Sequence, residues 1–184
     1  PDPDLPEADG LVSDRSQQAL WTASADCTPA LIADAATGRV AAVHAGWRGT
    51  AQRVIPAAIA RLEALGSHRE DLRVALGPAI AGEVYQVGEA VALDVGASLF
   101  PEDAPPSLEG LWELPQTPLL PDPEPGRVRL DVRRVNQLQL LGLGLSPSQI
   151  SIAPHCTFQE PERFFSYRRS HEKKIQRSGI VSQA

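Results

Sequence analysis

Short apolar runs alternate along this chain with stretches in which apolar residues recur at helical spacing. Residues 40–43 form an apolar run that fits a buried strand, whereas 50–65 shows the helical period and ends before Gly66, a natural helix stop. The regular strand-helix-strand rhythm and glycine fingerprint of a dinucleotide fold are missing. The pattern therefore predicts a mixed α/β (α+β) fold. Further strands are expected at 19–25, 29–34, 74–76, 128–130, 149–153, 164–167 and 180–181, and helices at 88–99 and 132–141.

Four segments interrupt this pattern. Pro56 lies inside the helical stretch, so the helix either begins near it or is kinked there. The first ten residues are expected to form a loop, and residues 46–49, with two glycines, to form the connection after the strand at 40–43. Residues 101–126 hold many of the 17 prolines and are expected to form an extended surface excursion.

Size and charge exclude several classes of protein. A chain of 184 residues with 42% hydrophobic content predicts one domain, residues 1–184. The formal net charge of -6 argues against nucleic-acid binding, which needs clustered Lys and Arg. No run approaches the roughly 20 apolar residues of a membrane span, and no leader opens the chain, so we expect a cytoplasmic protein. Because the chain contains no Met, we expect the native protein to begin further upstream.

The densest group of reactive side chains lies at the ends of two expected strands. Asp26 and Cys27 precede the strand at 29–34, and His44 ends the strand at 40–43. If these strands are neighbours, a thiolate and an imidazole converge, which suits a zinc ion with an open position for water. The same pair also suits a metal-independent cysteine nucleophile with its base. In isolation, either residue is more often an ordinary part of the core.

A second group lies near the C-terminus, where aromatic and basic residues adjoin at 164–169. Charge runs are most often solvated surfaces, but Arg168 and Arg169 beside aromatic rings also suit an anion attached to a heterocycle. Arg48, in its glycine-flanked segment, is another candidate for binding an anion. His155 is either structural or part of a site. Cys27 and Cys156 are expected to be free thiols, or one of them a thiolate ligand, because a chain of this length does not need a disulfide.

The motifs, taken together, resemble the YfiH-like, laccase-domain family. The resemblance covers about residues 8–181 and rests on distinctive blocks in matching order. These blocks are Ala25-Asp26-Cys27-Thr28-Pro29, His44-Ala45-Gly46-Trp47-Arg48-Gly49, Leu76-Gly77-Pro78-Ala79-Ile80, Val87-Gly88, Cys156-Thr157 and Phe164-Phe165-Ser166-Tyr167-Arg168-Arg169.

The resemblance implies a layered sandwich of mixed sheets flanked by helices, similar to the catalytic domain of cytotoxic necrotizing factor. It also implies one zinc site made by one Cys and two His, in which Cys27 and His44 match two ligands. The family's other His normally lies in a Gln-Val-His-Gly segment upstream of the block that appears here as residues 8–10. Only seven residues precede that block, so this ligand is absent from the given sequence.

The activities implied by the resemblance are phosphorolysis of adenosine, inosine, guanosine and methylthioadenosine, and deamination of adenosine. In that reading Arg48 binds phosphate, and Asp26 transfers a proton or supports the ligands. Tyr167, Arg168 and Arg169 bind substrate.

Two alternatives stay open, and one older label is disfavoured. Cys27 and His44 could serve an amidase, for example in editing peptidoglycan precursors. The stretch 101–126 could serve a non-catalytic partner-binding domain, which ranks last. The family's former label, multicopper polyphenol oxidase, is disfavoured because blue-copper and further copper sites need more ligands than four His and no Met.

Overall fold

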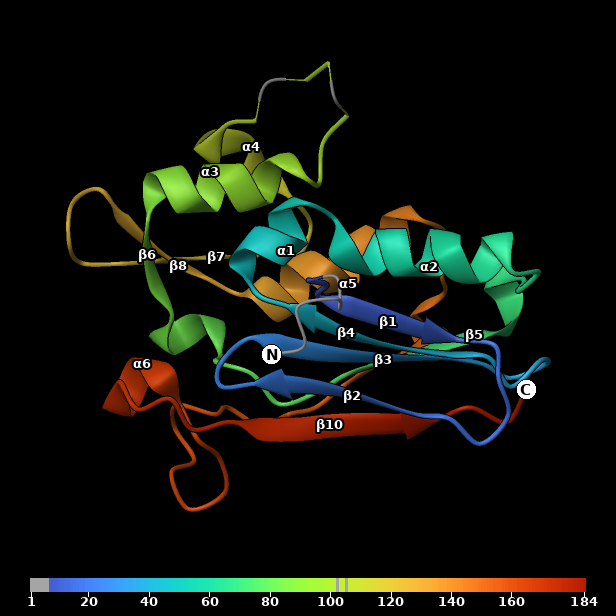
Figure 1. Cartoon of the computed structure of the whole chain (residues 1–184). Coiled ribbons are helices and arrows are strands. Elements are labelled where there is room, and N and C mark those ends of the chain that lie inside the picture. Colours follow the sequence, from blue (N-terminus) through green and yellow to red (C-terminus); the bar gives the residue numbers. More distant parts are fainter. Residues whose placement is uncertain (1–6, 102, 105) are drawn as a thin grey trace.

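The centre of the structure is a five-stranded sheet (Figure 1). Its strand order is β1-β4-β3-β5-β9. The computed structural model describes residues 7–101, 103–104 and 106–184. Neighbouring strands run antiparallel, except that β5 and β9 are parallel. The strands are β1 (Gly10–Ser13), β3 (Thr28–Asp34), β4 (Val40–Ala45), β5 (Leu72–Leu76) and β9 (Ile150–Ile152).

Helices cover one face of this sheet and a two-stranded sheet covers the other (Figure 1). Ile55 and Ile59 of α2 and Leu140 of α5 pack on the first face. Leu20 and Ile180 of the two-stranded sheet pack on the second. β4 is covered on both sides, which explains why it reads as a continuous apolar run. These elements are α1 (Trp47–Ala51), α2 (Val54–Ala64), α5 (Val132–Gly142), β2 (Ala19–Ser24) and β10 (Gln176–Val181).

A second core lies beside the main sheet, where the three-stranded sheet β6-β8-β7 packs with two further helices and with the start of α5. It includes part of the stretch 101–126, which was expected to be a surface excursion. That stretch contains α4 and β7 instead, and Leu111 of α4 is fully buried against this core. These elements are β6 (Gln86–Gly88), α3 (Glu89–Ala97), α4 (Leu108–Glu113), β7 (Leu119–Pro121) and β8 (Arg127–Leu130). Residues 102 and 105 lie outside the described residues.

Several predicted elements are confirmed and others are corrected. Pro56 lies in the first turn of α2, where a missing N–H costs no helical hydrogen bond. Residues 46–49, expected to be a connection, begin α1 at Trp47. The predicted strand at 164–167 is wrong. The Ser166 hydroxyl accepts a bond from the Arg169 N–H and so caps α6 (Tyr167–Ser170).

The predicted loop at the N-terminus extends to Asp9 in the described part, and residues 1–6 lie outside it. Short 3₁₀ helices complete the fold at η1 (Arg69–Asp71), η2 (Gly82–Val84) and η3 (Pro147–Gln149). Among the residues described, no helix is both long and apolar enough to cross a membrane.

Candidate functional site

Cys27 and His44 come together at one end of the main sheet, as the neighbouring-strand hypothesis predicts. β3 and β4 pair with Pro29 opposite His44, so Cys27, just before β3, lies beside Gly46. A Cβ placed on Gly46 would be 3.0 Å from the Cys27 Sγ and 3.5 Å from the His44 Cε1. The missing side chain of Gly46 therefore leaves room between the two predicted ligands.

Asp9 orients the His44 ring. Its Oδ1 lies 3.1 Å from the His44 Nδ1, and its backbone carbonyl accepts a 2.7 Å bond from the His44 N–H. A carboxylate on one ring nitrogen fixes the imidazole and leaves Nε2 for a metal or a substrate, an arrangement common around metal-binding histidines. The sequence analysis missed Asp9, because only the pairing of β1 with β4 brings it to His44.

The charge around Cys27 favours a cation. Burial, together with the nearby carboxylates of Asp26 and Asp9, raises the pKa of the Cys27 thiol to about 11. The thiol is therefore protonated at neutral pH unless a cation offsets these charges. A thiol and an imidazole are suitable zinc ligands, but zinc sites use three or more protein ligands. Within the described residues no group of three or more His, Cys, Asp or Glu could hold a metal ion, so the residues present fit such a site only in part.

Asp26 ties three segments together at the site. Its Oδ1 accepts a 2.7 Å bond from the hydroxyl of Thr157, and its Oδ2 accepts a 2.7 Å bond from the N–H of Arg168. Its backbone carbonyl accepts from the N–H of Ile80, and its φ of 90° is the strained left-handed value that few residues other than glycine adopt. Both carboxylate oxygens are thus engaged in holding the C-terminal segment against the Cys27 loop.

A small, mostly apolar pocket opens beside Cys27. Its lining residues come from both cores: Asp26, Cys27, Ala45, Gly46, Trp47, Ile80, Tyr85 and Val132. Two arginines that the sequence analysis proposed as ligand-binding residues, Arg48 and Arg168, flank this pocket. The Arg48 guanidinium lies 4.2 Å over the Trp47 ring, and the Arg168 guanidinium lies 4.7 Å over the Tyr85 ring. The sequence analysis assigned no site role to Trp47, although this residue lies in the distinctive block at 44–49. It also missed Tyr85, because nothing in the local sequence distinguishes Tyr85 from a core aromatic.

The structure places two other predicted residues away from this pocket. Arg169 donates to the carbonyls of Thr157, Phe158 and Phe164, so its guanidinium holds together the loop that precedes α6. The Tyr167 side chain is 50% exposed and packs edge-on against His171. Neither side chain lines the pocket beside Cys27.

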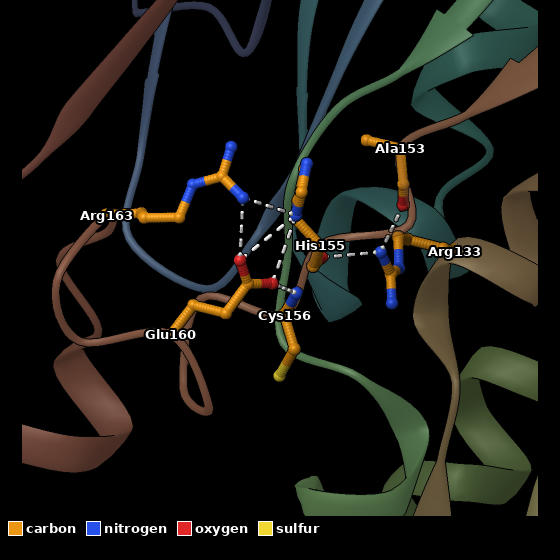
Figure 2. Close-up of polar contacts among 6 residues, drawn as sticks. All are labelled: Arg133, Ala153, His155, Cys156, Glu160 and Arg163. Atoms are coloured by element: carbon orange, nitrogen blue, oxygen red, sulfur yellow. Dashed lines mark hydrogen bonds and ion pairs between the residues drawn. The ribbon is translucent and has the colours of Figure 1, made fainter.

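His155 belongs to a polar cluster that supports the segment bound to Asp26 (Figure 2). Its Nδ1 lies 3.0 Å from a Glu160 oxygen, which also pairs with Arg163. The other Glu160 oxygen accepts from the Cys156 N–H, the first of several contacts that lower the Glu160 pKa. The buried Arg133 donates to the His155 carbonyl. His155 is thus paired with Glu160 and does not line the pocket beside Cys27. Cys27 and Cys156 form no disulfide.

Comparisons with known proteins agree with this architecture. A family model described as multi-copper polyphenol oxidoreductase laccase matches residues 1–181. A purine nucleoside phosphorylase of Synechocystis sp. is 58% identical over 99% of this chain and 70% of its own length. A purine nucleoside phosphorylase of Bacteroides thetaiotaomicron is 30% identical over 88% of this chain, which spans only 55% of that relative.

Solved structures show the same fold. YlmD from Geobacillus stearothermophilus superposes with a TM-score of 0.83 at 31% identity, covering 98% of this chain and 63% of that one. YfiH from Bacillus licheniformis gives 0.78 at 30% identity, covering 95% and 61%. The chain therefore belongs to the YfiH-like, laccase-domain family, whose model is described as multi-copper polyphenol oxidoreductase laccase.

Proposed function

We propose that this protein is a purine nucleoside phosphorylase that accepts adenosine, inosine, guanosine and methylthioadenosine and also deaminates adenosine. The proposal rests on the similarity to a relative named purine nucleoside phosphorylase, which is 58% identical over 99% of this chain.

Phosphorolysis needs a phosphate oxygen to attack the anomeric carbon of ribose while the glycosidic C–N bond breaks and the base leaves with a proton. Arg48 is the candidate for holding the phosphate, because its guanidinium is exposed and lies over Trp47 at the pocket. Asp26 has both oxygens engaged with Thr157 and Arg168. We therefore assign Asp26 to support of the site and not to proton transfer.

Zinc is the metal proposed for this protein, with the Cys27 sulfur and the His44 imidazole as two of its ligands. When bound, the ion would lower the pKa of a water for attack on the purine ring. Asp9 would keep His44 oriented through its Nδ1. The nearby carboxylates would favour the cation. The chain's four His and no Met provide too few ligands for a multicopper oxidase.

The test is phosphate-dependent release of hypoxanthine from inosine, with zinc content measured on the same samples. Cys27→Ala is expected to lose both. Gly46→Ala is the sharper variant, since its Cβ would occupy the space between Cys27 and His44 without removing either. Gly142→Ala is the matched control, because a Cβ there meets nothing within 4 Å. The proposal fails if Cys27→Ala releases hypoxanthine like the wild type.

A metal-independent Cys–His hydrolase is the second candidate, favoured by the convergence of Cys27 and His44 at Gly46. The raised pKa of the Cys27 thiol weighs against it, because the thiolate and not the thiol is the nucleophile. Alkylation of Cys27 with and without a chelator separates the two candidates. Equal rates of modification and inactivation in both conditions would support the hydrolase.

A further inference from the structure

Arg133 of α5 is a buried arginine that has no carboxylate partner. The residue is only 8% exposed, and its Nη1 donates bonds of 2.8 and 2.9 Å to the carbonyls of Ala153 and His155 (Figure 2). Its Nε is buried and has no hydrogen-bond partner among the described residues. None of the ion pairs in that part of the chain includes Arg133. A guanidinium stays charged when buried, so its charge is unbalanced unless an anion lies beside it.

An open pocket of about 410 Å³ lies against Arg133. This volume falls within the roughly 300–1,000 Å³ of small-molecule sites. The first residue of α5, Val132, lines the pocket beside Cys27, so the first turn of this helix borders two separate pockets. The residues that line the larger pocket come from the start of α5 and from the end of β9: Asp131, Arg133, Arg134, Gln137, Ile152, Ala153 and Pro154.

Positive charge prevails among the groups that line this larger pocket. Arg133 and Arg134 contribute two guanidinium groups, and the N-terminus of the eleven-residue helix α5 adds partial positive charge. Among the described lining residues, Asp131 provides the one carboxylate. Its Oδ1 accepts a 3.0 Å bond from the Arg134 N–H and so caps the helix. One carboxylate does not balance two guanidinium groups and a helix N-terminus, so the pocket favours an anion.

We propose that this pocket binds the phosphate group of a small phosphorylated molecule, with Arg133 and Arg134 as the residues that hold the anion. A guanidinium presents several N–H donors in one plane, which suits phosphate oxygens, and a helix N-terminus adds to the attraction. Ile152, which is 38% exposed, and Pro154 offer apolar surface to the organic part. The site is separate from Arg48, so the inference does not depend on the phosphorylase proposal.

NMR of the arginine side chains tests the site directly. In protein made with arginine labelled with heavy nitrogen, the Nε–H signals of Arg133, Arg134 and Arg48 are assigned from single Arg→Lys variants. Inorganic phosphate and ribose 5-phosphate are titrated separately at constant ionic strength, which keeps charge screening fixed. The Arg133 and Arg134 signals are expected to shift and saturate. A shift of the Arg48 signal alone, or no shift with either compound, would overturn the proposal.

The two compounds also distinguish the source of the phosphate group. Tighter binding of ribose 5-phosphate than of inorganic phosphate is expected, because only the ester reaches the apolar surface of Ile152 and Pro154. Equal affinities would overturn the organic part of the proposal and leave inorganic phosphate as the ligand.

Variants of the less buried lining residues test the charges without disturbing Arg133. Arg134→Met is expected to weaken ribose 5-phosphate binding about 10- to 100-fold, because it removes charge-assisted hydrogen bonds. Asp131→Asn keeps an acceptor at the helix cap and removes the opposing charge, so the affinity should rise about fivefold. Arg61→Met is the matched control, because Arg61 is an exposed arginine on α2 outside the pocket. Unchanged affinity in both Arg134→Met and Asp131→Asn would overturn the proposal.

The outcomes separate this inference from the phosphorylase proposal. Shifts of the Arg133 and Arg134 signals, in a protein that releases no hypoxanthine from inosine and phosphate, would retain the anion site and defeat phosphorolysis. Hypoxanthine release with unmoved Arg133 and Arg134 signals would defeat the anion site alone.

Discussion

The bond between Thr157 and Asp26 gives the most direct test of how the site is held together. Thr157 is fully buried, and its hydroxyl donates to a charged carboxylate at 2.7 Å. Hydrogen bonds to charged groups contribute about 1.5–3 kcal/mol, and a buried carboxylate left short of a donor keeps its desolvation cost. Thr157→Val keeps the shape and removes the bond, so we expect the free energy of unfolding to fall by about 2 kcal/mol. Thr157→Ser keeps the hydroxyl and loses one methyl group, a loss of about 0.8 kcal/mol.

Urea unfolding followed by circular dichroism measures these differences, provided that the m-value is unchanged. Asp26→Ala should cost more, since it also leaves the Arg168 N–H without its acceptor. The double variant with Thr157→Val should then reveal a coupling energy of about 1.5–3 kcal/mol. Equal losses for Thr157→Val and Thr157→Ser, or a coupling energy near zero, would refute the view that this bond holds the C-terminal segment on the Cys27 loop.

Two further predictions concern stability elsewhere in the fold. Burial works to raise the pKa of Asp34, but the hydrogen bonds it accepts outweigh burial and lower the pKa from 3.8 to about 2. A depressed pKa contributes stability, about 2 kcal/mol here, that is present above about pH 4 and lost as the pH falls through about 2. Urea titrations across this range should therefore show a flatter pH dependence in Asp34→Asn, and an unchanged slope would contradict the assignment. Gly96→Ala should lower the free energy of unfolding by about 1–3 kcal/mol, because its Cβ would meet the Leu111 side chain inside the second core. Gly142→Ala, with open space around it, should instead raise stability by about 0.4–1 kcal/mol, so equal effects in the same urea assay would count against the packing argument.

Local patterns in the sequence were sufficient to predict most of the central elements. The apolar run at 40–43 became β4. The helical period over 50–65 became the end of α1 and then α2, with a turn at 52–53 between them. Burial of a strand or of one helix face requires apolar residues at fixed positions, which the sequence displays directly. The same reasoning failed at 164–167. Phenylalanine and tyrosine favour strands, but the hydroxyl of Ser166 caps a helix there and Arg169 binds the preceding carbonyls.

The sequence by itself was sufficient to single out the candidate residues of this site: Cys27 and His44 at predicted strand ends, with Asp26 beside them. Only the tertiary structure showed that Asp9 orients His44 and that Tyr85 lines the pocket. Those contacts join segments far apart in the chain, and they exist only because β1 pairs with β4 and the second core packs against the first. Periodicity reports which face of an element is buried, whereas the partner it meets there is set by how the sheets and helices pack.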